Sequence, residues 1–439
     1  MAKILVATVP LTGHVQPMLL VVRALMARGH DVVWYAASKF RPAIEKAGAA
    51  FAPMHSTLDW DDADIEAALP ALQNRRGLAR VKAQLIHMFI QPMTKQLRDL
   101  EALVQQYAPD VVLADSAHLG AALVSETQRL PWATLGISAL VVPSIDTAPF
   151  GPGWRPSSSR IGRWRNRFLN WLVFRCMFRS VNQAYQRGRL AAAVPARSSY
   201  FESLSPYLYL QPTVPAFEYP RSDLAPQIRF IGPLVPQPSS NDVAMPTWWA
   251  EVEAAHQRGT PVVLITQGTL ATDAAELIVP ALRGLATHDV LAIVTTTQTL
   301  APGDVPANAR IATFIPYHLA MPLLAAVVTN GGYGGVQMAL RYGVPLVVAG
   351  GSEEKPEIAA RVAWCGAGIS LRTGRPSASN VAAAVTEVLR NAHYKARAGE
   401  IAQQMQCHDA PNEAATLIEQ LIGRERPPST ADPTSVQSS

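Results

Sequence analysis

Four glycines within five residues form the stretch of this chain whose chemistry is easiest to infer. The sequence there is Thr329-Asn-Gly-Gly-Tyr-Gly-Gly-Val336, between an apolar run at 325–328 that predicts a buried strand and a helix-forming segment at 336–341. Glycine lets a backbone approach a ligand closely, and the free N–H groups and positive dipole end of a helix favour an anion. We therefore predict a phosphate site at this turn. Glycine turns also occur merely to pack a helix on a sheet, and spacing alone leaves the two interpretations about even.

Charged side chains follow the next predicted strand. After the apolar residues 346–349 and the turn Gly350-Gly351-Ser352, the chain carries Glu353, Glu354 and Lys355 before another helical segment. Open α/β sheets bind ligands beyond the carboxyl ends of their strands. These charges are therefore expected beside the glycine turn, where they could hold sugar hydroxyls.

An imidazole and a carboxylate are expected at the matching edge of the amino-terminal half. His14 follows a predicted strand at 3–9, and Asp115 follows another at 111–114. A carboxylate can fix the tautomer of a histidine base and stabilise its imidazolium. Each residue also has an ordinary structural interpretation. His14 could be a capping or hydrogen-bonding residue, and Asp115 could cap a helix that begins at Ser116.

Alternating strands and helices define the fold class. Strand 3–9, a loop over 10–16, a helix over 18–28 opened by Pro17 and closed by Gly29, and strand 31–36 form a βαβ unit. The second half restarts with a buried strand at 261–266, the turn Gly268-Thr269 and a helix from about 273 to 285. The loop over 10–16, after the first strand, has no G-x-G-x-x-G, which argues against a dinucleotide-binding first domain. We predict an α/β protein with parallel sheets.

Two motifs resemble the UDP-glycosyltransferase superfamily, and in particular its bacterial macrolide and antibiotic enzymes. Residues 330–362 resemble its nucleotide-sugar signature, and Thr12-Gly-His-Val-Gln-Pro17 is similar to its amino-terminal signature. The usual pattern has His-Gly-Gly-x-Gly-Thr, Glu-Ala-Leu, Gly-Val-Pro and Asp-Gln. This chain departs from the pattern at four places, with Asn330 for His, Gly335 for Thr, Met338 for Glu, and Glu354-Lys355 for Asp-Gln. These changes are compatible with phosphate binding by the backbone, but they remove side-chain hydrogen-bond donors and leave the identity of the sugar undetermined.

The resemblance implies a GT-B fold, with two Rossmann-like domains whose parallel sheets face a central cleft. It implies that His14 deprotonates the acceptor and that Asp115 is its partner. The residues expected at the donor phosphates are Gly268, Thr269, Asn330, Gly331, Gly332, Tyr333, Gly334 and Gly335, with Glu354 and Lys355 at the sugar and Ile315, Tyr317 or His318 at the nucleobase. A proline turn at a strand end is an equally weighted interpretation of the nucleobase segment.

Domain boundaries follow from composition and from the resemblance. We expect an acceptor-binding domain over 1–232, a linker rich in Pro, Ser and Asn over 233–246, and a nucleotide-sugar domain over 247–410. A helix over 411–423 is expected to cross back to the first domain, and the tail 424–439 is expected to be disordered.

Composition excludes several classes. The 439 residues are 49% hydrophobic, enough for packed cores, yet no window reaches the ~18 apolar residues of a membrane span. The apolar start lacks a cleavage site, and three widely spaced cysteines fit reduced thiols, so a cytoplasmic protein is expected. The net charge of +5 slightly favours anionic ligands. No nucleic-acid motif and no metal-site spacing occur, and no cofactor is expected, since the nucleotide sugar is a co-substrate.

Residues 160–189 are basic and aromatic. Eight arginines accompany side chains such as Trp164, Phe168 and Trp171, and no acidic residue occurs in the segment. Such a helix can lie on an anionic membrane surface, here the inner membrane face, or line a hydrophobic acceptor pocket. The alternative, held at about one half, is a core helix with a solvated arginine face.

The sequence thus predicts an inverting, metal-independent glycosyltransferase. It would move a hexose from a UDP- or dTDP-sugar to a hydroxyl of a hydrophobic small-molecule or lipid-like acceptor. The alternative is a nucleotide-sugar-binding protein without transferase activity, which the changes at Asn330, Gly335 and Lys355 would allow. An epimerase is less favoured, because that role calls for several carboxylates in the cleft.

Overall fold

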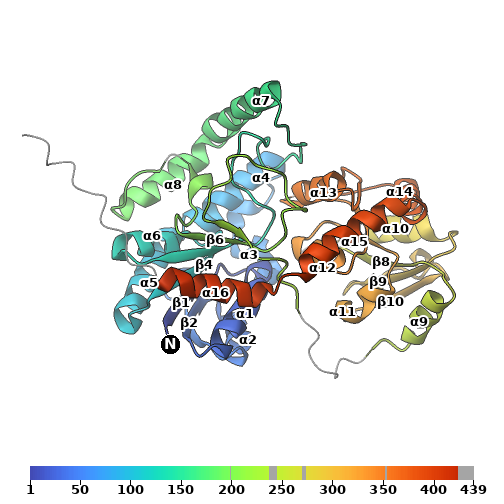
Figure 1. The fold of residues 1–439 in the computed structure, drawn as a ribbon, viewed down its shortest axis with the longest axis horizontal. Helices are drawn as coiled ribbons and strands as arrows, with labels where there is room; N and C mark the ends of the chain where they lie inside the picture. The colour runs from blue at the N-terminus through green and yellow to red at the C-terminus, as the bar shows by residue number, and fades with distance from the viewer. Residues whose placement is uncertain (198, 237–244, 269–272, 352, 424–439) are drawn as a thin grey trace, which may run out of the picture.

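Two parallel β-sheets organise the chain (Figure 1). The computed structural model describes residues 1–197, 199–236, 245–268, 273–351 and 353–423. The first sheet has the order β3-β2-β1-β4-β5-β6-β7 and the second the order β10-β9-β8-β11-β12-β13. The strands of the first sheet are β1 (Lys3–Ala7), β2 (Asp31–Ala36), β3 (Ala50–Pro53), β4 (Val111–Asp115), β5 (Trp132–Leu135), β6 (Leu208–Gln211) and β7 (Ile228–Phe230). Those of the second are β8 (Val262–Thr266), β9 (Leu291–Thr295), β10 (Ala309–Ala312), β11 (Ala326–Thr329), β12 (Leu346–Val348) and β13 (Gly368–Ser370).

The helices cover both faces of these sheets, as parallel sheets require. In the first half they are α1 (Thr12–Ala27), α2 (Arg41–Lys46), α3 (Ile65–Ala68), α4 (Gly77–Gln84), α5 (Met93–Tyr107), α6 (Leu119–Gln128), α7 (Arg160–Trp171) and α8 (Arg179–Ala191). In the second half they are α9 (Trp249–Gln257), α10 (Ile278–Leu285), α11 (Tyr317–Ala320), α12 (Tyr333–Arg341), α13 (Lys355–Trp364), α14 (Ala378–Arg390), α15 (Ala392–Gln406) and α16 (Ala410–Ile422). The central strands β1, β4 and β8 are almost wholly apolar and buried, which confirms the predicted α/β class with two parallel sheets.

Helix α1 begins earlier than the sequence predicts. The expected loop over 10–16 is wrong, because the helix starts at Thr12 and Pro17 lies inside it. Asp62, fifty residues away, accepts hydrogen bonds from the Thr12 N–H (2.6 Å) and hydroxyl (3.1 Å). This distant cap stabilises the first turn, and Pro17, in the second turn, removes one backbone hydrogen bond of the helix.

Two helix starts in the second half also differ from the prediction. Helix α12 starts at Tyr333, so Gly334 and Gly335 belong to its first turn. Helix α10 starts at Ile278, because residues 274–277 form turns, with the Gln298 side chain accepting from the Ala274 N–H at 2.8 Å.

The two halves share buried contacts. Helix α16 packs on α1, and Glu419 pairs with Arg28 at 2.8 Å and with His30 at 2.9 Å. Figure 1 shows the last helix (red) lying across the amino-terminal half. Val214 and Phe217, which follow β6, pack into the core of the second half. The boundaries proposed from sequence stay predictions, and residues 237–244 of the expected linker and the tail 424–439 lie outside the described residues.

None of the helices in the described ranges is both long and apolar enough to cross a membrane.

Candidate active site

His14 and Asp115 form a buried pair at the carboxyl edge of the first sheet. Strand β1 lies beside β4, with Ala7 in register with Ala114, so α1 starts where β4 ends. His14 is the third residue of α1, and its Nδ1 lies 3.0 Å from Asp115 Oδ1. The imidazole is only 7% exposed and the carboxylate 1%.

The surroundings of Asp115 keep it ionised. Burial raises the pKa of its carboxyl, but the charge and hydrogen bond of His14 outweigh burial and the pKa is lowered. Asp115 also accepts hydrogen bonds from the backbone N–H groups of Val9 and Ala117, each at 2.7 Å. An ionised carboxylate at Nδ1 places the proton there and leaves Nε2 as the basic nitrogen. The alternative role of a helix cap is not what the structure shows, because Ala117 lies in a turn and the N-cap of α6 is His118.

The opposite side of the imidazole faces aromatic surroundings. The Phe89 ring is stacked on His14 with 6.4 Å between centroids and an interplanar angle of 26°. Phe89 lies in a π-helical segment, Leu85–Ile90. Within the described ranges, His14 Nε2 has no hydrogen-bond partner.

The glycine turn presents a helix start to open space. Gly331 has φ +90°, and a Cβ there would lie 2.9 Å from Val348 Cγ1, so only glycine fits. A Cβ on Gly334 or Gly335 would meet nothing within 4 Å. The first-turn N–H groups of α12 lack intrahelical acceptors, as in any helix, and are suited to an anion.

Asn330 braces this turn instead of reaching outward. Its Nδ2 donates to the carbonyl of Gln267, at the end of β8, and its buried Oδ1 has no partner among the described residues. Gly268, with φ +76°, lies next to Asn330, because a Cβ added at Gly268 would lie 3.5 Å from that Oδ1. Thr269, the other residue predicted here, lies outside the described residues. An unpaired buried acceptor beside the glycine turn is one group that a bound donor could satisfy.

The side chain of Tyr333 points away from the turn. Its buried hydroxyl accepts from Gln211 Nε2 at 2.9 Å and donates to the Pro212 carbonyl at 3.4 Å, both in the first half of the chain. Only the Tyr333 backbone N–H is thus left for a phosphate.

Glu354 lies close to the glycine turn. It precedes α13, whose first residue, Lys355, has its carbonyl 3.4 Å from where a Gly331 Cβ would lie. Burial and the charge of Glu353 raise the pKa of Glu354, and the His14 charge acts in the opposite direction. The Lys355 ammonium pairs with Glu353 at 2.9 Å.

The predicted nucleobase residues have different surroundings. Ile315 is buried in the core, and the Tyr317 hydroxyl donates to Thr266 Oγ1 at 3.0 Å, at the end of β8. His318 is half-buried. Phe314, which sequence reasoning missed, is 60% exposed and offers a free ring for base stacking. An aromatic residue directly before Ile-Pro was the available signal.

Sequence reasoning also missed His118, behind the pair. It is 2% exposed, and its Nδ1 caps α6 by accepting from the Ala121 N–H at 3.2 Å. Burial lowers its pKa to about 4, against the opposing charge of Asp115. His118 is therefore neutral, and the spacing Asp-x-x-His at a strand end could have indicated it.

Comparisons with known proteins identify relatives of this chain. Residues 281–421 match the family model described as the erythromycin biosynthesis protein CIII-like, C-terminal domain. The chain is 42% identical to 4'-demethylrebeccamycin synthase of Lentzea aerocolonigenes over 96% of this chain and 100% of that protein. It is 32% identical to UDP-glycosyltransferase 2 of Phaeomoniella chlamydospora, over 95% of each chain.

Solved structures share the fold. The glycotransferase of kitacinnamycin superposes with a TM-score of 0.74 at 21% identity, covering 96% of this chain and 99% of that chain. The glycosyltransferase VinC, in complex with dTDP, has a TM-score of 0.67 at 19% identity, covering 96% and 100%. The GT-B arrangement expected from the sequence is confirmed.

Proposed function

Because this chain belongs to the UDP-glycosyltransferase superfamily, among the GT-B glycosyltransferases that act on small-molecule natural products, we propose that it is an inverting hexosyltransferase. Its donor would be a UDP- or dTDP-sugar and its acceptor a hydroxyl of a hydrophobic small molecule. The observation that carries this proposal is the buried pair His14 and Asp115 at the carboxyl edge of the first sheet.

The proposed reaction is a single displacement. His14 Nε2 takes the proton of the acceptor hydroxyl, and Asp115 stabilises the imidazolium that forms. The acceptor oxygen attacks the anomeric carbon from the face opposite the nucleoside diphosphate, which inverts the configuration. The first-turn N–H groups of α12 stabilise the charge on the leaving diphosphate. The mechanism needs neither a metal ion nor a cofactor, because these amides and the helix dipole supply the positive potential.

The donor and acceptor classes are supported by relatives. Relatives at 32% identity are named as UDP-dependent enzymes, and VinC was solved with dTDP. The stacked ring of Phe89 favours an apolar, ring-containing acceptor next to His14. A protein that only bound nucleotide sugars would not require a paired, buried base, so the transferase is preferred over the binding protein.

The test is a donor and acceptor screen. The protein is incubated with UDP- and dTDP-hexoses, with and without aromatic and lipid alcohols, and free nucleoside diphosphate and glycoside are measured. We expect diphosphate release coupled to a glycoside of inverted anomeric configuration. Donor binding with no release under any condition would favour the binding protein instead.

We also propose that the α7–α8 arm makes peripheral contact with an anionic membrane. Ile161, Trp164, Phe168 and Trp171 form one exposed stripe along α7, each 48–82% exposed. A hollow of about 590 Å³ beside α8 is lined by arginines, among them Arg175, Arg179 and Arg187. Apolar rings beside arginines are typical of helices that lie in a membrane interface.

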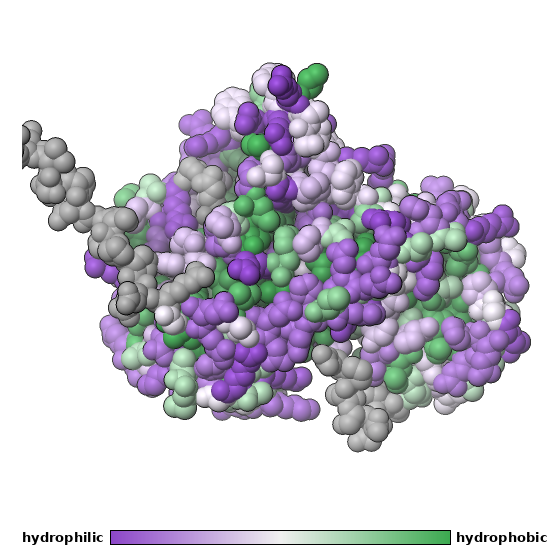
Figure 2. Space-filling model, in the orientation of Figure 1, coloured by the Kyte–Doolittle hydropathy of each residue, from purple (hydrophilic) through white to green (hydrophobic). Residues whose placement is uncertain are grey.

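The arm projects from the body in Figure 1 and forms the top of the surface in Figure 2. Sedimentation with vesicles of phosphatidylglycerol and phosphatidylcholine tests the contact. Binding is expected to anionic vesicles and to fall at least ~10-fold in Trp164→Ala, with Tyr207→Ala, an exposed aromatic outside the arm, as the control. Equal binding by both variants would reject the contact.

A further inference from the structure

A buried ion triad joins the two halves of the molecule away from the pair His14 and Asp115. Arg361, on α13, donates through Nε to Glu218 at 2.8 Å and through Nη1 to Glu357 at 2.8 Å. The three side chains are 1%, 1% and 4% exposed. Glu218 follows β6 of the first sheet, so the triad crosses from one half to the other.

The remaining oxygens of the triad hold a loop of the first half. Glu357 Oε1 accepts from the N–H groups of Gly151 and Gly153, each at 2.8 Å. Glu218 Oε1 accepts from the Leu140 N–H at 2.7 Å. Every carboxylate oxygen is therefore used. Arg361 Nη2 also donates to the Leu140 carbonyl at 3.4 Å, so residues 140 and 151–153 are all bound to side chains of α13. Contact is close, because a Cβ on Gly153 would lie 2.5 Å from the Pro356 carbonyl.

This loop starts beside Asp115, the partner of the proposed base. It leaves the first sheet at the end of β5, where Leu135 is in register with Asp115. Residues 136–159 contain neither helix nor strand. A displacement of the loop would therefore change the acceptor side of the proposed site, next to Asp115.

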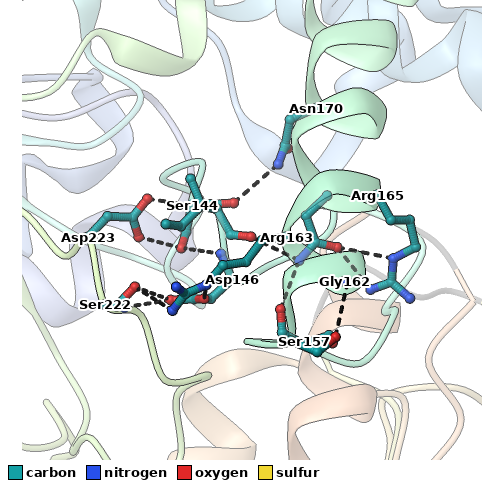
Figure 3. A network of polar contacts seen from close by, with 12 residues as sticks. Ser144, Asp146, Ser157, Gly162, Arg163, Arg165, Asn170, Ser222 and Asp223 are labelled. Carbon is teal, nitrogen blue, oxygen red and sulfur yellow. Dashed lines mark hydrogen bonds and ion pairs between the residues drawn. The ribbon is translucent and has the colours of Figure 1, made fainter.

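The other side of the loop is fastened to α7, as Figure 3 shows. Asp146 accepts from Arg163 Nε at 2.7 Å and from the Ser222 N–H at 2.7 Å. Ser144 donates to Asp223 at 2.5 Å. Segments 144–146 and 222–223 and helix α7 are therefore held together on the acceptor side.

On the donor side, Glu357 lies one turn after the proposed sugar contact. Its N–H donates to the Glu354 carbonyl at 3.0 Å, within the first turn of α13. A force on Glu357 therefore moves Glu354 and Lys355, because one helical turn behaves as a unit.

We infer that Glu357 and Arg361 are positioning residues that fix the acceptor-side loop to the donor-sugar end of α13. This inference rests on the proposed function. The triad keeps the acceptor oxygen and the anomeric carbon at a constant separation although they are held by different domains. It acts through the loop and the helix start and touches neither substrate.

A merely structural triad would behave differently. Breaking a buried pair destabilises a protein in either case, so a lower Tm does not decide. If the triad positions the substrates, a variant that breaks it should also lose the coupling between donor cleavage and transfer. The donor would still bind, but its sugar would be transferred to water instead of the acceptor. The ratio of glycoside to free hexose at a temperature below the Tm separates the two roles.

The experiment compares Glu357→Gln and Gly153→Ala with wild type. Glu357→Gln places an amide against Arg361, and Gly153→Ala pushes the loop off α13 while leaving the triad intact. Glu400→Gln, which breaks an exposed ion pair with Arg397 on α15, is the matched control. Diphosphate release, glycoside and free hexose are quantified, and diphosphate binding is followed by thermal shift.

Both test variants are expected to lose about 10-fold or more in transfer kcat and to hydrolyse a larger share of the donor, because ångström-scale misplacement is costly in group transfer. Diphosphate affinity should stay within about two-fold of wild type, since α12 is untouched. Wild-type product ratios in a folded Gly153→Ala protein would overturn the inference, whatever happens to Glu357→Gln. Absence of transfer by wild type itself would instead refute the proposed function.

Discussion

Asp115 accepts three hydrogen bonds, two from backbone N–H groups and one from His14, and this fixes its role at the residue scale. A carboxylate held by three donors has a lowered pKa and stays ionised through the neutral range. It therefore orients the imidazole, and in the proposed reaction it would leave the acceptor proton to His14. His14 and Asp115 are 101 residues apart, so the pair exists only because β1 and β4 are neighbours.

Replacing the base should separate chemistry from binding. His14→Ala is expected to lower turnover by ~10² or more and to retain donor binding, since the imidazole acts only on the acceptor proton. Asp115→Asn should lower turnover by a comparable ~10², because an amide does not stabilise an imidazolium. Initial rates and thermal shift with nucleoside diphosphate check both. Unchanged turnover in His14→Ala would remove the proposed base.

His118 gives a prediction about pH. Its pKa is about 4 when folded, against 6.5 for the free side chain. As pH falls below 6.5 the unfolded chain takes up a proton that the folded chain excludes, so stability is present above that pH and is lost on acidification. The loss at pH 5 relative to pH 8 is about 2 kcal/mol from this group.

His118→Asn should flatten that pH dependence, because asparagine keeps a cap for α6 but does not titrate. Asp115, His14 and Tyr35 surround the site and remain in both proteins. Unfolding of the first half in urea at pH 5 and pH 8 provides the comparison. An identical pH dependence in the two proteins would contradict the assignment.

At the scale of elements, the start of α12 is the feature that a diphosphate would use. Two glycines at this start have different constraints, one before the helix and one in its first turn. Gly331 is fixed by its left-handed backbone and by Val348, whereas Gly335 lies in an ordinary helical turn facing open space. Glycine is therefore required at position 331, whereas position 335 has room for a side chain.

Alanine substitutions at these two glycines should change the free energy of unfolding in opposite directions. Gly335→Ala is expected to stabilise the protein by about 0.5–1 kcal/mol, because it removes backbone entropy from a helix. Gly331→Ala should destabilise it by about 1–3 kcal/mol through backbone strain. Urea unfolding of the second half measures both. Equal effects would show that the local geometry has been assigned wrongly.

Restoring the usual family residue at the same helix start should affect the donor. Gly335→Thr adds a hydroxyl beside the first-turn amides, and one hydrogen bond to a charged group is worth roughly ten-fold in diphosphate affinity. Gly335→Ala is the control, with unchanged affinity. Titration calorimetry with UDP and dTDP decides, and a weaker complex for Gly335→Thr would contradict the proposed phosphate position.

At the scale of the whole molecule, the last helix belongs to the first sheet's core. Ala414, Ala415, Ile418 and Leu421 are buried in the same cluster as Val22 and Leu25 of α1. The chain therefore crosses from the second half back to the first, and the core of the first half includes residues from the other end of the sequence.

Truncation tests this dependence. Ending the chain after His408 removes α16 and should lower the Tm of the first half by about 5 °C or more, because each buried Ile or Leu contributes about 2 kcal/mol. Ending it after Gly423 keeps α16 and is the control. Calorimetric scans of the two truncated proteins give the comparison, and equal losses would mean that α16 is not what stabilises α1.

The sequence by itself determined the features that depend on neighbouring residues. Apolar runs identified the strands, glycines identified the turn before α12, and the end of β4 identified Asp115. It did not determine where α1 begins, because the cap comes from Asp62, nor where Tyr333 points, because its partners lie 121 and 122 residues away. Within the triad, the i,i+4 spacing of Glu357 and Arg361 is a local signal, but nothing local indicated Glu218, which lies 143 residues from Arg361. Periodicity and propensity act over a few residues, whereas burial and ion pairing are decided only when distant segments are brought together.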